Sequence, residues 1–176
     1  MSEAKFRKFI SELEFDEGAI YHNGQRLWLA STDWIANLQK RMEETLGTNG
    51  AYAIIYEASS EGGRQLGKGL AKRFEGLPIE KQIQAYFDFA TMRGLGRITV
   101  EEFQLEPFRL VVKGEKSYIK GIITDADEGH CYMTAGFSTI IEGLLAAQGI
   151  QKELKQDETK CVSMGHNHCE FLITEK

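Results

Sequence analysis

The chain is poor in cysteine, proline, histidine and tryptophan, and it has no long apolar run. Its 176 residues include three cysteines, two prolines, four histidines and two tryptophans. Three thiols cannot all pair within one chain, so metal binding or burial explains them better than a disulfide framework, with a Cys161–Cys169 pair as the alternative. No stretch approaches the roughly 20 apolar residues of a membrane-spanning helix, and the amino terminus lacks the apolar core of a signal peptide. We therefore expect a cytoplasmic protein with no membrane partner.

Positive charge is also scarce. The 21 lysines and arginines face 26 aspartates and glutamates, for a formal net charge of -5, which argues against a general binder of nucleic-acid phosphates. The 42% hydrophobic and 27% charged residues are typical of a globular protein. Because the length suits one buried core and is too short for two ordinary ones, we expect a single domain over residues 1–176.

The amino-terminal half combines a hairpin signal with several helical periods. Asn23-Gly24 suits a type I′ turn and lies between two β-prone runs, which predicts a hairpin over residues 18–30. Helical spacing, caps and stops predict helices over 3–13, from Ser31 to a stop at Gly47, over 51–74, and from Pro78 to Met92 before Gly94.

A stripe of small and apolar residues runs along the helix predicted over 51–74. It consists of Ala51, Ile55, Ala58, Gly62, Leu66 and Leu70. Glycine on such a face lets a helix approach another backbone closely, so we expect a tight contact there.

The carboxyl-terminal half mixes strands with one apolar helix. Residues 97–112 are rich in β-branched and aromatic side chains and predict strands broken near Pro107. Residues 131–148 predict a helix that ends at Gly149, and two further strands flank the G-H-N-H turn at 165–168. Because helices and strands interleave and two hairpins are predicted, the sequence indicates the α+β class, with helices packed on an antiparallel sheet.

Cysteine and histidine concentrate in residues 157–171, D-E-T-K-C-V-S-M-G-H-N-H-C-E-F. Glu158, Cys161 and Cys169 offer a carboxylate and two thiolates, and Zn²⁺ takes about four such ligands in tetrahedral geometry. In a regular strand Glu158 and Cys161 would face opposite sides, so this site requires a bulge or turn near Thr159.

The fourth ligand must come from another part of the chain. Cys131, at the start of its predicted helix, competes with three histidines, His130, His166 and His168. The alternative is that all three thiols are small buried hydrophobes and that the histidines solvate a turn.

Two motifs resemble the carboxyl-terminal half of the 4-vinyl-reductase domain family. They are C-Y-M-T-A-G-F at 131–137 and E-T-K-C-V-S-M-G-H-N-H-C-E-F at 158–171. That family includes a protein linked to bacteriochlorophyll synthesis, the sensor domains of aromatic-responsive transcription activators, and free-standing proteins described as hydrocarbon-binding. The resemblance implies a fold similar to vesicle-tethering subunits and nitric-oxide-sensing haem domains, often dimeric.

The resemblance also implies a metal site and a ligand pocket. In the aromatic sensors the matching positions hold zinc, and carried over residue by residue they fall on Cys131, Glu158, Cys161 and Cys169. With four protein ligands, such a zinc ion would be structural. A pocket for a small apolar or aromatic molecule is implied beside it. Its candidate lining residues are Trp34, Tyr86, Phe89, Tyr132 and Phe137.

We therefore predict a non-catalytic, zinc-stabilised domain that senses or carries a small hydrophobic molecule and acts as a homodimer, with any signal passing through a protein partner or the dimer interface. One alternative is a reductase, or a reductase-accessory protein, acting on a vinyl group of a tetrapyrrole. The chain shows no G-x-G-x-x-G after a strand and no flavin signature that would bind a hydride donor. Another alternative is a dimeric assembly scaffold, which needs no pocket.

Overall fold

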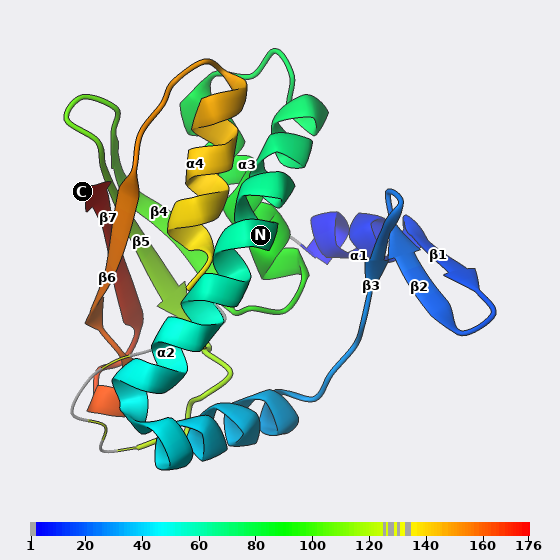
Figure 1. Ribbon diagram of the computed structural model, residues 1–176. Coiled ribbons are helices and arrows are strands. Elements are labelled where there is room, and N and C mark those ends of the chain that lie inside the picture. The colour runs from blue at the N-terminus through cyan, green and yellow to red at the C-terminus, as the bar shows by residue number, and fades with distance from the viewer. Residues whose placement is uncertain (1–2, 125, 127–128, 130, 133–134) are drawn as a thin grey trace.

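In the computed structural model, which describes residues 3–124, 126, 129, 131–132 and 135–176, helices cover one face of a four-stranded sheet (Figure 1). The strand order is β4-β5-β7-β6, and every neighbouring pair is antiparallel. The strands are β4 (Arg97–Gln104), β5 (Arg109–Glu115), β6 (Leu154–Lys160) and β7 (Cys169–Glu175). The α+β class and the antiparallel sheet are confirmed.

Three helices form the two layers above this sheet. They are α2 (Thr32–Arg73), α3 (Ile79–Met92) and α4 (Phe137–Ala147). Helix α4 lies between the sheet and the second half of α2 (Figure 1). Because it is covered on both sides, its residues from Phe137 to Leu145 are all buried, and the buried carboxylate of Glu142 is paired with Arg64 at 2.8 Å. None of the helices in the described part of the chain is long and apolar enough to cross a membrane.

Local signals in the sequence account for the path of α2. The Ser31 side chain accepts a hydrogen bond from the Trp34 backbone N–H at 3.2 Å and caps the helix. At Gly47 the backbone is not helical (φ 72°, ψ 160°), a conformation that glycine adopts at little steric cost. The helix is therefore two segments joined at a kink, which confirms the predicted stop at Gly47.

The second segment of α2 packs tightly on α4 through glycines, although not through the predicted stripe. Ala58 and Gly62 are exposed, whereas Gly63 and Gly67 are buried against α4. A β-carbon added at Gly67 would lie 2.9 Å from the Cα of Gly143 and would collide with the Ile140 carbonyl oxygen. The predicted close approach of α2 to another backbone is confirmed, but the glycines that make it are Gly63 and Gly67 and not the predicted Gly62. Small residues occur on neighbouring faces of this helix, and the sequence alone does not show which of these faces meets α4.

The amino-terminal residues form a small module that contacts α3 (Figure 1). It consists of α1 (Glu3–Ser11), β1 (Leu13–Asp16), β2 (Ala19–His22) and β3 (Gln25–Leu27). Asn23 and Gly24 both have positive φ, 51° and 75°, so the predicted hairpin turn is confirmed. The Phe9 and His22 rings pack on Phe89 of α3, with centroid distances of 6.3 and 5.7 Å. The module is thereby joined to the main body.

Candidate metal centre and adjoining cavity

Four potential metal ligands from separate segments meet at one end of the sheet. One ligand atom each from Cys131, Glu158, Cys161 and Cys169 lies within 4.8 Å of the others. The register of β6 against β7 shifts between Glu158 and Lys160. This irregularity at Thr159 is the predicted bulge, and it allows Glu158 and Cys161 to face the same space. A 3₁₀ turn, Val162–Met164, then leads back to Cys169 at the start of β7.

Cys131 lies ahead of α4 and not in its first turn. The helix begins at Phe137, so the prediction of a helix from 131 was wrong. Cys131 does not start the helix because its backbone N–H donates to Oε2 of Glu158 at 2.7 Å, which holds it beside β6. The segment before the helix is thus tied to β6 by the candidate ligands themselves.

The three sulfur atoms are spaced like ligands of one tetrahedral ion. The Sγ atom of Cys131 lies 3.6 Å from that of Cys161 and 3.4 Å from that of Cys169, and the Cys161–Cys169 distance is 3.8 Å. A tetrahedral site with Zn–S bonds of about 2.3 Å has sulfur atoms about 3.8 Å apart. A disulfide needs about 2.05 Å, and all three cysteines are free. The alternative of a Cys161–Cys169 disulfide is therefore wrong for this structure.

Burial makes negative charge costly at this cluster. Burial, together with the nearby Cys161 thiolate, raises the pKa of Glu158 to about 8. Hydrogen bonds from the Cys131 and Cys169 thiols hold the pKa of Cys161 well below the ordinary value of a thiol, with help from the Ser163 hydroxyl at 3.0 Å. Without a cation the cluster therefore stabilises one negative charge and disfavours a second. A divalent cation reverses that balance.

One carboxylate oxygen of Glu158 is left for such a cation. Oε1 is buried and has no hydrogen-bond partner among the residues that the structure describes. A buried polar atom without a partner costs about 1–3 kcal/mol, and metal coordination would remove that cost. His166 is exposed, His168 is half-buried, and neither belongs to the cluster. His130 lies outside the described residues.

The five aromatic residues predicted to line a pocket lie in different places. Tyr86 and Phe137 are both buried and pack edge to face, with ring centroids 6.0 Å apart. Trp34, in the first turn of α2, is 50% exposed and packs against the exposed Trp28. The structure therefore brings Tyr86 and Phe137 together in the core and places Trp34 at the surface.

The two remaining aromatics have their own partners. Phe89 packs between α3 and the amino-terminal module, against Phe9 and His22. Tyr132 is buried next to the metal cluster and packs edge to face on Tyr52 of α2, at 6.2 Å between ring centroids. Of the predicted pocket residues, only Tyr132 is adjacent in sequence to a candidate metal ligand.

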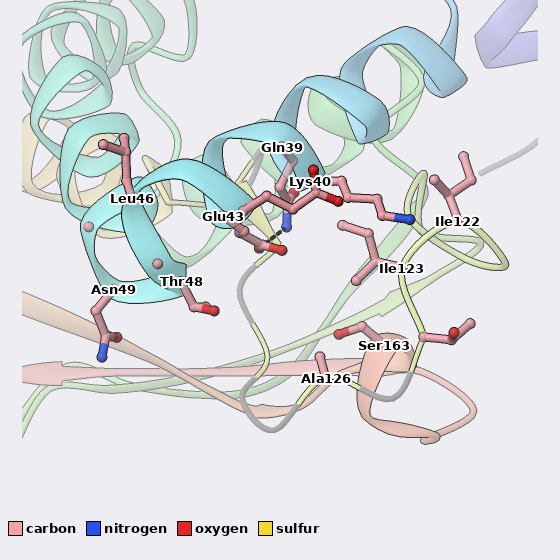
Figure 2. Close-up of a pocket in the computed structure, with 14 residues that line it drawn as sticks. Gln39, Lys40, Glu43, Leu46, Thr48, Asn49, Ile122, Ile123, Ala126 and Ser163 are labelled. Atoms are coloured by element: carbon pink, nitrogen blue, oxygen red, sulfur yellow. Dashed lines mark hydrogen bonds between the residues drawn. The ribbon is translucent and has the colours of Figure 1, made fainter.

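A cavity of about 630 Å³ adjoins the metal centre (Figure 2). It lies between the kink of α2 and the segment that includes Ile122 and Ile123. Residues that line it include Gln39, Glu43, Leu46, Ile122, Ile123 and Ser163. Ser163 also donates its hydroxyl to Cys161, so one residue belongs to both the cavity and the cluster. The sequence did not predict this cavity because its walls come from three distant segments, around the α2 kink, Ile122–Ile123 and Ser163. Of these, only the helix break at Gly47 was expected.

Comparison with known proteins identifies one family model and several similar solved structures. The family model described as "Activator of aromatic catabolism" matches residues 8–106. The crystal structure of the phenol-responsive sensory domain of the transcription activator PoxR with phenol is 20% identical. It superposes with a TM-score of 0.80 over 99% of this chain and 92% of that chain. No curated protein matches.

A second solved structure extends the likeness to the vesicle-tethering fold. A trafficking protein particle complex subunit 3 from Naegleria fowleri, covalently bound to palmitic acid, is 14% identical. Its TM-score is 0.51 over 82% of this chain and 95% of that chain. At these identities both structures establish the fold alone. The aromatic-sensor and vesicle-tethering resemblances are confirmed, whereas the 4-vinyl-reductase family name is not.

Proposed function

The chain belongs to the family of activators of aromatic catabolism, and on this basis we propose that it is a non-catalytic sensory or carrier domain for a small hydrophobic or aromatic molecule. The observation that carries the proposal is the cavity of about 630 Å³ at the kink of α2, which shares Ser163 with the metal cluster. This volume is within the range of small-molecule sites. We also propose that residues 1–176 act as one domain.

The proposed metal is a structural Zn²⁺ held by Cys131, Glu158, Cys161 and Cys169. The sulfur spacing and the unpartnered Oε1 of Glu158 support this ligand set. Four protein ligands leave no open position for substrate or water, so the ion would not act as a Lewis acid. It would fix the β6–β7 hairpin to the segment before α4, and its binding free energy would contribute to folding.

A ligand in the cavity would contact residues on both sides of the α2 kink and Ser163, whose hydroxyl donates to Cys161. Tyr132 strengthens this connection, because it follows Cys131 and donates its hydroxyl to the backbone oxygen of Thr48, a residue of the cavity lining, at 3.5 Å. Ligand binding would thus be transmitted to the kink and to the metal centre together. A homodimer and a protein partner remain proposals, and the exposed Trp28, Leu29 and Trp34 offer apolar surface for them. Light scattering tests the homodimer directly.

Small aromatic molecules are expected to raise the melting temperature in a concentration-dependent way. At a concentration of about 100 Kd a ligand stabilises the folded state by about 2.7 kcal/mol, which is on the order of 5–10 °C for a chain of this size. Toluene, phenol and cyclohexane would be compared by differential scanning fluorimetry and then by calorimetric titration.

Two tryptophan substitutions control for this result. Ile123→Trp fills the cavity and should remove the shift, whereas Ile54→Trp alters an exposed site on α2 outside the cavity lining and should leave it unchanged. The sensory proposal fails if none of these molecules shifts the transition of the wild-type protein.

The pH dependence of the metal-free protein should reveal the buried Glu158 carboxyl. Its pKa is raised from about 4.5 to about 8 on folding, so between these values the folded state holds a proton that the unfolded state releases. This contribution to stability is present at low pH and is lost as the pH rises through about 8. In urea unfolding of chelator-treated protein, the free energy of unfolding of the wild type should fall between about pH 4.5 and 8 relative to that of Glu158→Gln. Parallel pH profiles for the two proteins would contradict the prediction.

A further inference from the structure

The cavity beside the metal centre presents one carboxylate that its neighbours hold in place, that of Glu43. Gln39 donates to Oε1 of Glu43 at 3.0 Å (Figure 2). Gln39 is only 4% exposed, and its own oxygen accepts a hydrogen bond from the Tyr118 hydroxyl at 2.5 Å. Glu43 is therefore a preorganised acceptor in a half-buried position.

The other charges of the lining are exposed. Glu44 is also part of the lining, but it is exposed and pairs with the exposed Arg41 at 2.6 Å. Lys40 is exposed, and its side chain extends along the rim of the cavity toward Ile122 (Figure 2). Exposed charges are screened by salt and contribute little to binding. The electrostatic character of the interior is thus decided by Glu43.

An apolar wall faces this carboxylate. Ile122 and Ile123 are half-buried and line the cavity, with the side chain of Ile123 pointing toward it in Figure 2, and Leu46 of α2 is a further apolar residue of the lining. A compact apolar group that packs against these side chains would be stabilised by about 25 cal/mol for each Å² of apolar surface that it buries. A polar group attached to it would then reach Glu43. The cavity therefore suits an amphipathic molecule rather than a pure hydrocarbon.

We propose that this cavity binds a small amine, with a cyclic or branched apolar body against Ile122 and Ile123 and its ammonium group donating to Glu43. The inference rests on the proposed function and names its ligand class. A hydrogen bond from an ammonium to a positioned carboxylate is about twice as strong as one between neutral groups. A carboxylate ligand would instead place like charges together, which disfavours binding.

Three isosteric probes test the head group. Benzylamine, benzyl alcohol and benzoate share one ring and differ mainly in charge, and their binding to the full chain would be measured by calorimetric titration. Benzylamine is expected to bind about tenfold more tightly than benzyl alcohol, and benzoate least tightly, since hydrogen bonds to charged groups are worth about 1.5–3 kcal/mol. Benzoate binding as tight as benzylamine, or no binding of benzylamine, overturns the proposal.

Variants show whether Glu43 is the group responsible. Glu43→Gln should weaken benzylamine about tenfold or more and leave benzyl alcohol within about threefold, whereas Glu44→Gln should change neither. Benzylamine binding that Glu43→Gln does not alter also overturns the proposal.

The same titrations separate this inference from the proposed function. If toluene or phenol binds with an affinity that Glu43→Gln does not change, and benzylamine does not bind, the sensory function stands and the amine site is rejected. If benzylamine binds and Glu43→Gln weakens that binding, the amine site is supported even if toluene and phenol do not bind. If none of these aromatic molecules binds, both proposals fail.

Discussion

Replacing Cys161 with serine is expected to remove the bound metal and to lower the melting temperature by on the order of 10 °C. Cys161 is buried and lies 3.6 and 3.8 Å from the other two thiols, and among the residues that the structure describes no fifth ligand belongs to the cluster. A hydroxyl is a poor zinc ligand beside thiolates. Mass spectrometry of the tag-free wild-type protein should find about one zinc ion per chain, and calorimetry would give the change in melting temperature.

Other substitutions in the same hairpin separate metal loss from general damage. Glu158→Ala should behave like the Cys161 variant, whereas Glu170→Ala removes a carboxylate of β7 that bonds Lys160 and Thr159 and should retain the metal. Ser163→Ala removes a hydrogen bond to Cys161 without removing a ligand, so it should weaken metal retention only partly. A wild-type protein that folds stably without metal and takes up no zinc would contradict the proposed centre.

Gly67→Ala is expected to destabilise the protein by about 3 kcal/mol, the upper end of overpacking effects. The new β-carbon would collide with the Ile140 carbonyl oxygen and would lie 3.0 Å from the Leu144 backbone nitrogen. Both atoms belong to the α4 backbone and cannot rotate away as a flexible side chain can, so α2 and α4 must separate. The resulting fall in melting temperature, on the order of 10 °C, would be measured by calorimetry of the metal-loaded protein.

Gly69→Ala is the matched control for this prediction. Gly69 lies on the same helix, and a β-carbon there meets nothing within 4 Å. Alanine is favoured over glycine inside a helix by about 1 kcal/mol, so this variant should gain stability where Gly67→Ala loses it. Equal effects at the two positions would mean that α2 and α4 do not cross as closely as the structure shows.

Positions governed by local backbone chemistry were predictable from the sequence. Asn23-Gly24 forms the expected turn, Ser31 caps α2, and Gly47 interrupts it, because each depends mainly on the allowed φ and ψ of a few consecutive residues. The need for a bulge near Thr159 followed in the same way, since strand side chains alternate between faces and two ligands three residues apart must share one.

The candidate metal ligands were predictable for a different reason. A cluster of thiols and a carboxylate is rare in a chain with few cysteines, and the resemblance of the two motifs singled out Cys131, Glu158, Cys161 and Cys169 as one set. The structure places their ligand atoms within 4.8 Å of one another. The same resemblance could not locate the start of α4, because the hydrogen bond between Cys131 and Glu158 joins residues 27 positions apart.

Only the tertiary structure decided which faces and side chains come together. It selected Gly63 and Gly67 over Gly62 as the contact with α4, and it placed Trp34 at the surface. It also formed the cavity around Glu43, which depends on the kink of α2 lying against Ile122 and Ser163. The sequence by itself thus determined turns, caps, breaks and the types of metal ligand, which are local properties of the chain. The packed faces and the ligand cavity depend on contacts between distant segments, and no local pattern encodes which segments will meet.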